Sequence, residues 1–396
     1  MALVDQIKRL SDELAPETIQ VRRHLHAHPE LSYQEHATAA LVEQHLTRLG
    51  LPFRRLATTG LVSEIVGHKP GKTVALRADL DALPIQEKND GPYRSTVPGV
   101  MHACGHDVHT SSLLATAGIL ARIRNEFAGT VRLIFQPGEE KNPGGASLMI
   151  KEGVLGNPQP VSILGQHVMP LIPVGQVGFR EGMYMASSDE IYLRVIGKGG
   201  HAGAPHLVVD PVVIAANIIV ALQQVVSRQA DPRQPTTLNF GKVVAQGATN
   251  IVPEEVTMAG TFRALNEVWR EVALERISKL AQGVAEGMGG RCEVRISRGY
   301  PYLENDVTLT RRMRQAAVQY VGESNVVDLE VTLGSEDFAY YSHVVPACFY
   351  RLGTGNAARG ITSYVHTPTF DIDEAALHLG PGLMAWMAIQ ELGQPA

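Results

Sequence analysis

The sequence has few cysteines and no strong excess of charge of either sign. Cys104, Cys292 and Cys348 are the three cysteines in 396 residues, too few and too scattered for a disulfide framework. Lysine and arginine number 35 against 40 acidic residues, which gives a formal net charge of −5 and lacks the basic footprint of a nucleic-acid-binding protein. We therefore expect no nucleic-acid partner and a reducing compartment, the cytoplasm.

Long apolar runs are also missing from the sequence. No run reaches the roughly 18 apolar residues that suggest a membrane span, and the first twenty residues mix charged with apolar side chains, unlike a secretory signal. The most apolar stretch, 208–226, is interrupted by Asp210, Pro211 and Asn217 and by a glutamine pair. We expect a soluble protein without a membrane segment.

The composition that is present is globular. Hydrophobic residues make up 44% and charged residues 19% of the chain, which excludes a disordered or collagen-like protein. At roughly 150 residues per domain, the length predicts two or three domains.

The first 183 residues alternate predicted helices and strands. Helical spacing of apolar residues predicts helices at 7–25, with a break near Pro16, and at 34–49. Short runs rich in Val, Ile and Leu predict strands, at 61–67, 72–80, 130–137 and 161–168, with helices at 109–124 and 145–153. Because these strands are apolar on both faces, we expect a mostly parallel sheet covered by helices, an α/β fold.

The pattern changes near residue 184. The predicted elements then follow the order β-α-β-β-α-β over about 110 residues, the split-βαβ arrangement, with helix starts at Asp210–Pro211 and Asn266. From about residue 298 the predicted helices and strands again follow the α/β pattern of the first 183 residues. We therefore predict a larger domain formed by residues 1–183 and 298–396, and an inserted ferredoxin-like domain at 184–297. The exposed edge of its sheet favours pairing with a second copy.

One short motif suits metal binding. Cys104 and His106 are two residues apart in MHACGHDVHT, which sets a thiolate and an imidazole on one side of a loop ahead of a helix. Such a pair suits zinc and other borderline metals. A buried thiol beside a helix-capping histidine would give the same pattern.

Further acidic and imidazole side chains follow predicted strands or precede the last helix. They are Asp79 and Asp81, Glu139 and Glu140 in a Gly/Pro turn, His167 and His366. Ligands of α/β sheets bind at the carboxyl ends of the strands, so these side chains can meet at one rim. One glutamate can hold a metal while its neighbour polarises a water, although an ordinary acidic loop is the alternative. The two aspartates point to one face and can bind a metal or orient a ligating histidine.

The remaining candidates are interpreted as supporting or structural residues. They are His24, His26 and His28, which cap or pack near the first helix, His102 and His109, which flank the metal loop, and the core residues Cys292 and Cys348.

Ten motifs, in this order, resemble those of the M20-type metallopeptidases. They are HAHPELSYQE, RADLDALPIQE, MHACGHDVHT, FQPGEE, GQHVMP, GKGGHAGAPH, GATNIVPEE, GTFRAL, GSEDFAYY and HTPTFDIDE. They extend over essentially the whole chain, which is most similar to the branch that contains aminoacylases, hippurate hydrolases and auxin-conjugate hydrolases.

The resemblance implies a site for two divalent metal ions per subunit. The ligands that it implies are Cys104, His106, Glu140, His167 and His366. Five side chains do not complete two sites of about four ligands each, so we expect Cys104 or Glu140 to bridge the ions. Zinc, manganese, cobalt and nickel all remain candidates, with the thiolate favouring zinc.

The resemblance also implies that residues 1–183 and 298–396 form a catalytic domain and 184–297 a lid or dimerisation domain, and it implies the catalytic residues. Glu139 would be the general base that activates water, with Asp81 orienting the site. His201, in the inserted domain, would stabilise the oxyanion, usually in the site of a dimer partner. Asn250 and Arg263 would contact the substrate, since an arginine fork suits a carboxylate. The alternative for His201 and Asn250 is a structural role in turns, and the alternative for Arg263 is a surface charge on a strand.

The reaction that follows is hydrolysis of the amide bond of a small-molecule N-acyl amino acid. A dipeptidase or carboxypeptidase on the same scaffold is the main rival hypothesis. A non-catalytic metal-binding homologue is disfavoured, because Glu139, His201 and all five implied ligands are present.

Overall fold

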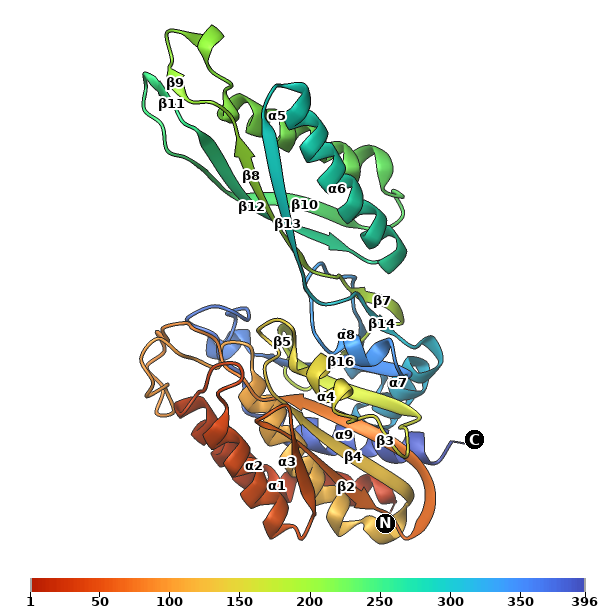
Figure 1. Cartoon of the computed structure of the whole chain (residues 1–396). Coiled ribbons are helices and arrows are strands. Elements are labelled where there is room, and N and C mark those ends of the chain that lie inside the picture. The colour runs from red at the N-terminus through yellow and green to blue at the C-terminus, as the bar shows by residue number, and fades with distance from the viewer. Residues whose placement is uncertain (1, 395–396) are drawn as a thin grey trace. The chain divides into compact units, whose positions relative to one another are not determined.

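The computed structural model describes residues 2–394, which form two compact units (Figure 1). The larger unit contains the described residues up to Gly182, Glu304–Glu330 and the described residues from Asp337 onward. The smaller unit contains Met183–Leu303 and Val331–Glu336. The sequence had assigned this last segment to the larger domain. It groups with the smaller unit because Thr332 forms a β-bridge with Met185.

The centre of the larger unit is a parallel sheet. Strand β3 (Lys69–Asp79) pairs in parallel with β4 (Ala128–Gln136) and β5 (Ser162–Pro173), and β5 pairs in parallel with β16 (Ala347–Gly355). The predicted mostly parallel, helix-covered α/β sheet is confirmed.

Short strands extend this sheet to eight, in the order β1-β2-β4-β3-β5-β16-β6-β15. The additional strands are β1 (Phe53–Leu56), β2 (Gly60–Val66), β6 (Val177–Phe179) and β15 (Val326–Asp328). Strand β2 runs antiparallel to both β1 and β4, and β6 runs antiparallel to β16. Most of these edge strands were not predicted, because three or four residues are too few to show a period.

Three long helices cover the sheet in two layers. Helices α3 (His106–Arg122) and α9 (Ala376–Leu392) pack on β3 and on each other, and α1 (Leu3–Ala27) packs on both. Every residue of α3 from His106 to Leu120 is buried, because the helix lies between other elements on all sides. The break predicted near Pro16 is wrong, since α1 is continuous through it. Packing against α3 and α9 outweighs the one backbone hydrogen bond that a proline cannot donate.

Shorter helices complete the larger unit. Helix α2 (His36–Arg48) packs on β2, α4 (Gly145–Lys151) on β4, and α7 (Val307–Val321) and α8 (Ala339–Ser342) on β16. Asp306 accepts a hydrogen bond from the Leu309 amide and so caps α7.

The smaller unit has the predicted β-α-β-β-α-β order. Its antiparallel sheet, in the order β10-β12-β8-β13, is formed by β8 (Asp189–Ile196), β10 (Thr236–Ala245), β12 (Glu255–Ala264) and β13 (Arg291–Arg298). Helices α5 (Pro211–Gln224) and α6 (Glu267–Gly287) pack on it. Asp210 and Asn266 cap these helices as predicted. Strands β9 (Gly200–His201) and β11 (Ile251–Val252) form a separate short antiparallel pair. The chain passes between the units within β7 (Gly182–Met185) and β14 (Leu303–Asn305), and again on either side of Val331–Glu336.

Helix α5 and the turn after it form the most apolar segment. Residues Pro211–Gln229 have a mean hydropathy of 1.5, and 33% of that window is buried. By length and composition alone the segment passes the test for a membrane span, contrary to the expectation from the sequence. One such helix is weak evidence for a membrane span. Val212, Val213 and Val220 are exposed apolar residues of α5, and we call them the α5 face.

Candidate metal centre

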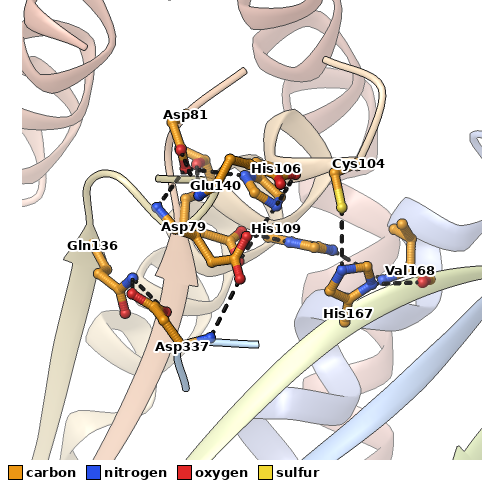
Figure 2. Close-up of polar contacts among 12 residues, drawn as sticks. Asp79, Asp81, Cys104, His106, His109, Gln136, Glu140, His167, Val168 and Asp337 are labelled. Atoms are coloured by element: carbon orange, nitrogen blue, oxygen red, sulfur yellow. Dashed lines mark hydrogen bonds and ion pairs between the residues drawn. The ribbon is translucent and has the colours of Figure 1, made fainter. Parts of the chain in front are cut away.

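The carboxyl ends of the central strands bring the predicted acidic and imidazole residues together (Figure 2). Asp79 ends β3, Glu139 and Glu140 follow β4, and His167 lies in β5. This is the edge at which parallel sheets bind their ligands. The strands therefore supply one side of the candidate site.

A tight turn before α3 supplies the other side. Gly105 has a φ of +84°, and a side chain there would bring a Cβ to 2.5 Å from Val168 Cγ2. Glycine is therefore required between Cys104 and His106. Cys104 is 6% exposed and His106 is fully buried, so both side chains face inward.

The five predicted ligands fall into two groups that share Cys104. One group is Cys104 with His106 and His167, and the other is Cys104 with Glu140 and His366. Within each group the possible ligand atoms lie within 4.8 Å of one another, and Cys104 Sγ is 3.4 Å from His167 Nε2. The thiol is thus the group through which two neighbouring cation positions can be joined.

Two buried atoms of this cluster have no hydrogen-bond partner among the described residues. They are His106 Nε2 and Glu140 Oε1, although the second lies within ion-pair distance of His366 Nε2, at 3.2 Å. The other ring nitrogen of His106, Nδ1, lies 3.2 Å from Asp81 Oδ1. Buried polar atoms are normally paired, and thiolate, imidazole and carboxylate together form a donor set for borderline divalent metals. The residues therefore fit a metal.

His366 closes the cluster from a constrained loop. Its φ of +62° lies in the left-handed region, which costs energy for a residue with a side chain. The His366 amide donates to Ala103 O at 2.7 Å, which ties the loop to the residue before Cys104. Interactions with Cys104 and Glu140 raise the pKa of His366 to about 10.

The electrostatics of the cluster favour a cation. Burial, with Glu140 beside it, raises the pKa of the Cys104 thiol. Burial opposes protonation of His106, but Asp79 and Cys104 outweigh it and raise the pKa of that imidazole well above its usual range. Protons therefore sit among these donors, and a bound divalent ion would displace them.

Glu139 lies beside the cluster and is held in place. It is 6% exposed, and its Oε1 accepts a hydrogen bond from the Asp337 amide at 3.3 Å. The Asp337 carboxylate accepts from Arg77 Nη2 at 2.8 Å and from Gln136 Nε2 at 2.8 Å. A buried, oriented carboxylate next to a metal cluster can take a proton from water.

Asp81 organises the loop that carries the two glutamates. Its carboxylate accepts the amide hydrogens of Glu139 and Glu140, each at 3.0 Å, and the Ser32 hydroxyl at 2.6 Å. Burial alone would raise the pKa of Asp81, but hydrogen bonds from His106 and Ser32 lower it. The group is therefore an ionised acceptor at neutral pH.

Sequence reasoning assigned no role to the loop before α2, although it supports the site. Tyr33 donates its hydroxyl to Lys141 O at 2.8 Å, and Glu35 accepts the Gly138 amide at 2.8 Å. Both contacts hold the loop that contains Glu139. The letters HPELSYQE were part of the family resemblance, but no spacing within them pointed to this contact.

His26 also has a larger role than the sequence suggested. His26 Nδ1 lies 2.7 Å from Asp107 Oδ2, and Arg22 Nε donates to the same oxygen at 2.8 Å. Burial would raise the pKa of Asp107, but Arg22 and His26 lower it far below its usual range. This buried ion network fixes the first turn of α3, next to His106.

The other three predicted site residues belong to the smaller unit. His201 is exposed in β9, and its Nδ1 accepts the Gly203 amide at 2.9 Å. Asn250 is exposed in a turn, and its carbonyl accepts the Ala202 amide at 3.1 Å. Arg263, in β12, donates to Ser335 Oγ at 2.9 Å, and burial lowers its pKa. The cluster of the larger unit is built without these residues.

Comparison with known sequences gives one family match. Residues 75–388 match the sequence profile of Peptidase family M20/M25/M40. The chain is 39% identical over 376 residues to the N-acetylcysteine deacetylase of Bacillus subtilis, covering 94% of this chain and 96% of the relative. It is 42% identical over 297 residues to the N-acyl-L-amino acid amidohydrolase of Geobacillus stearothermophilus, covering 75% and 80%.

Two further similarities bear on the chemistry. The chain is 38% identical over 394 residues to thermostable carboxypeptidase 2 of Saccharolobus solfataricus, covering 98% of this chain and 99% of the relative. Among solved structures, it resembles a Bacillus subtilis protein described as a dinuclear metal-binding peptidase of the M20 family. That match has a TM-score of 0.83 and 35% identity, and covers 96% of this chain and 99% of the other.

Proposed function

The chain belongs to peptidase family M20/M25/M40, whose members hydrolyse carbon–nitrogen bonds, and we propose that it cleaves the amide bond joining an acyl group to an amino acid. The observation that carries this proposal is the buried donor cluster around Cys104 with Glu139 beside it. Similarity to relatives named as an N-acyl-L-amino acid amidohydrolase and an N-acetylcysteine deacetylase supports the substrate class.

Two divalent ions would be held by the two donor groups that share Cys104. The full ligand set would be Cys104, His106, Glu140, His167 and His366. Zinc, manganese, cobalt and nickel suit these donors, and the thiolate favours zinc. When bound, the ions would polarise the scissile carbonyl and lower the pKa of water.

The residues of the larger unit supply the proton transfers. Glu139 would take the proton of the attacking water and pass it to the nitrogen of the leaving amino acid. The Asp337 amide at Glu139 Oε1 keeps the carboxylate in one orientation. Asp81, through the amide hydrogens of Glu139 and Glu140, would hold both glutamates at the spacing the reaction needs.

Residues of the smaller unit would complete the substrate site. His201 would donate a hydrogen bond to the developing oxyanion. Arg263 would bind the carboxylate of the amino acid through its planar fork, and Asn250 would contact the substrate beside it. The exposure of His201 and Asn250 leaves them available for these contacts.

A substrate panel tests the proposed function. Protein loaded with each divalent ion should hydrolyse hippurate, N-acetyl amino acids or indole-acyl amino acids with a higher kcat/KM than dipeptides that carry a free amino group. As a control, each N-acyl amino acid is compared with the derivative in which a carboxamide replaces its carboxylate. If Arg263 binds the carboxylate, the carboxamide should be the poorer substrate. Loss of this preference in Arg263→Leu assigns the discrimination to that guanidinium.

The second candidate is a carboxypeptidase or dipeptidase, favoured by the 38% identity to thermostable carboxypeptidase 2. Faster cleavage of peptides than of all N-acyl amino acids in the panel would replace the proposed function with this one. An absence of hydrolysis by metal-loaded protein on every amide would contradict both.

A second copy of the chain is the partner that we propose. The α5 face exposes Val212, Val213 and Val220, with Val220 74% exposed, and the sheet of the smaller unit ends at the edge strands β10 and β13. Apolar surface of this kind favours association. In such a dimer, His201 of one subunit would serve the cluster of the other.

Mixing two inactive variants tests this arrangement. Glu139→Gln and His201→Ala should each have little activity, and a mixture of the two, dissociated and reassociated, should recover a part of it. A mixed dimer has one site in which both residues are intact only if His201 acts across subunits. No recovery in mixtures that form mixed dimers by mass spectrometry, or a monomer by light scattering, would overturn the arrangement.

A further inference from the structure

We propose that His109 is a positioning residue that fixes the end of strand β5 and so sets which nitrogen of His167 faces Cys104. The proposal rests on the metal centre proposed above. His109 lies in the first turn of α3 and is 1% exposed. Figure 2 shows its ring between Asp79 and the end of β5.

Both ring nitrogens of His109 are engaged. Nδ1 lies 2.6 Å from Asp79 Oδ1, and Nε2 accepts the Val168 amide hydrogen at 2.9 Å. An ionised carboxylate only accepts and an amide N–H only donates, so the proton of His109 must be on Nδ1. The two partners therefore fix the tautomer of His109.

Val168 still lies opposite Leu352 of β16, but it lies beyond the part of β5 that pairs with β3. Strand β3 pairs with β5 only as far as Arg77 opposite Gly165 among the described residues. Val168 is fully buried, and a buried amide without an acceptor destabilises the folded chain. His109 supplies the acceptor that a neighbouring strand would otherwise provide.

The orientation of His167 follows from the same strand end. His167 Nδ1 lies 2.7 Å from Val168 O, which can only accept, so Nδ1 carries the proton. The remaining nitrogen, Nε2, has a free electron pair and is the atom 3.4 Å from Cys104 Sγ. A shift of the Val168 peptide would move this carbonyl, and with it the nitrogen offered to a metal.

A rival interpretation makes His109 itself a ligand. Asp79, His106 and His109 form another group whose possible ligand atoms lie within 4.8 Å of one another. Hydrogen bonding argues against it, since Asp79 accepts from His109 on Oδ1 and from Arg77 on Oδ2. Both nitrogens of His109 are also engaged, so His109 offers a cation no free electron pair.

Affinity for metal is the first test. Outer partners of metal-ligating histidines typically contribute about 10–100-fold to metal affinity, and His109→Phe should weaken Zn²⁺ binding by an amount in this range in competition with a chromogenic chelator. His109→Gln, which retains an acceptor for the Val168 amide, should recover part of the loss. Thr116→Val is the matched control, because it removes a buried hydrogen bond of α3 to Pro381 O and should leave the affinity unchanged.

The second test measures the tautomers of His109 and His167. If His109 only stabilised the fold, replacing it would not change the tautomer of His167. Nitrogen-15 NMR of metal-free wild type should show His109 and His167 with the proton on Nδ1, and His109→Phe should give His167 a mixture of tautomers. With ¹¹³Cd bound, coupling should reach His167 and not His109.

Coupling to His109 would make it a ligand, and wild-type affinity in His109→Phe would show that it positions nothing. Either result overturns the inference while the metal centre stands. Failure of the wild type to bind any divalent ion would instead contradict the proposed function.

Discussion

Replacing Glu139 by glutamine should lower turnover by about 10²–10⁴-fold, the usual contribution of a general base, while metal content stays at the wild-type level. Glutamine keeps the size of the side chain and an oxygen that can accept the Asp337 amide hydrogen, found at 3.3 Å in the wild type. It cannot take a proton from water. The measurement is kcat on the best N-acyl amino acid, with metal per chain determined by elemental analysis of the same sample.

The neighbouring glutamate provides a matched control. Glu140→Gln makes the same chemical change one residue away, but Glu140 belongs to the donor group with Cys104 and His366. That variant should lose metal, and added metal should restore part of its activity. Wild-type turnover in metal-loaded Glu139→Gln would refute the base assignment. Equal loss of metal from the two variants would make Glu139 a ligand instead.

Residue type and position along the chain were enough to predict the members of the candidate site. Cys104 and His106 were found from their spacing, and Glu139, Glu140 and His167 from their places after apolar strands. Parallel strands bring their carboxyl ends to one edge, so the sequence order of the elements already implied that these residues meet. His366 was found from its place before the last helix, and the family resemblance added the division of roles.

The contacts that orient these residues could not be predicted from the sequence in the same way. Asp81 binds two backbone amides of a loop 58 and 59 residues away, and the hydroxyl of Ser32 reaches Asp81 from yet another segment. The residue types of Ser32 and His109 do not indicate these contacts, and only the folded chain shows what the two side chains touch. The same holds for Val331–Glu336, whose place in the smaller unit depends on long-range contacts such as the Met185–Thr332 bridge and the hydrogen bond from Arg263 to Ser335.

Replacing Cys104 by alanine should have the largest effect on metal content. Cys104 is the one residue common to both ligand groups among the described residues, so its loss should weaken both cation positions, whereas loss of His106 or His366 should weaken one. Elemental analysis after dialysis should find fewer than two ions per chain, and activity should fall with the metal. Cys348→Ala, which removes another fully buried thiol of the larger unit, is the control and should retain the metal.

Replacing Cys104 by aspartate tests whether the shared ligand must be sulfur or only an anionic donor. Cys104→Asp keeps an anionic donor, so it should bind more metal than Cys104→Ala. Its affinity should also depend less on pH. Burial raises the pKa of the Cys104 thiol, so in the wild type a cation must displace the thiol proton, and metal affinity should fall as the pH is lowered. An aspartate loses its proton at lower pH than this thiol, so the fall should be shallower. Full metal content in Cys104→Ala, or parallel pH dependences in the wild type and Cys104→Asp, would exclude the thiolate as the shared ligand.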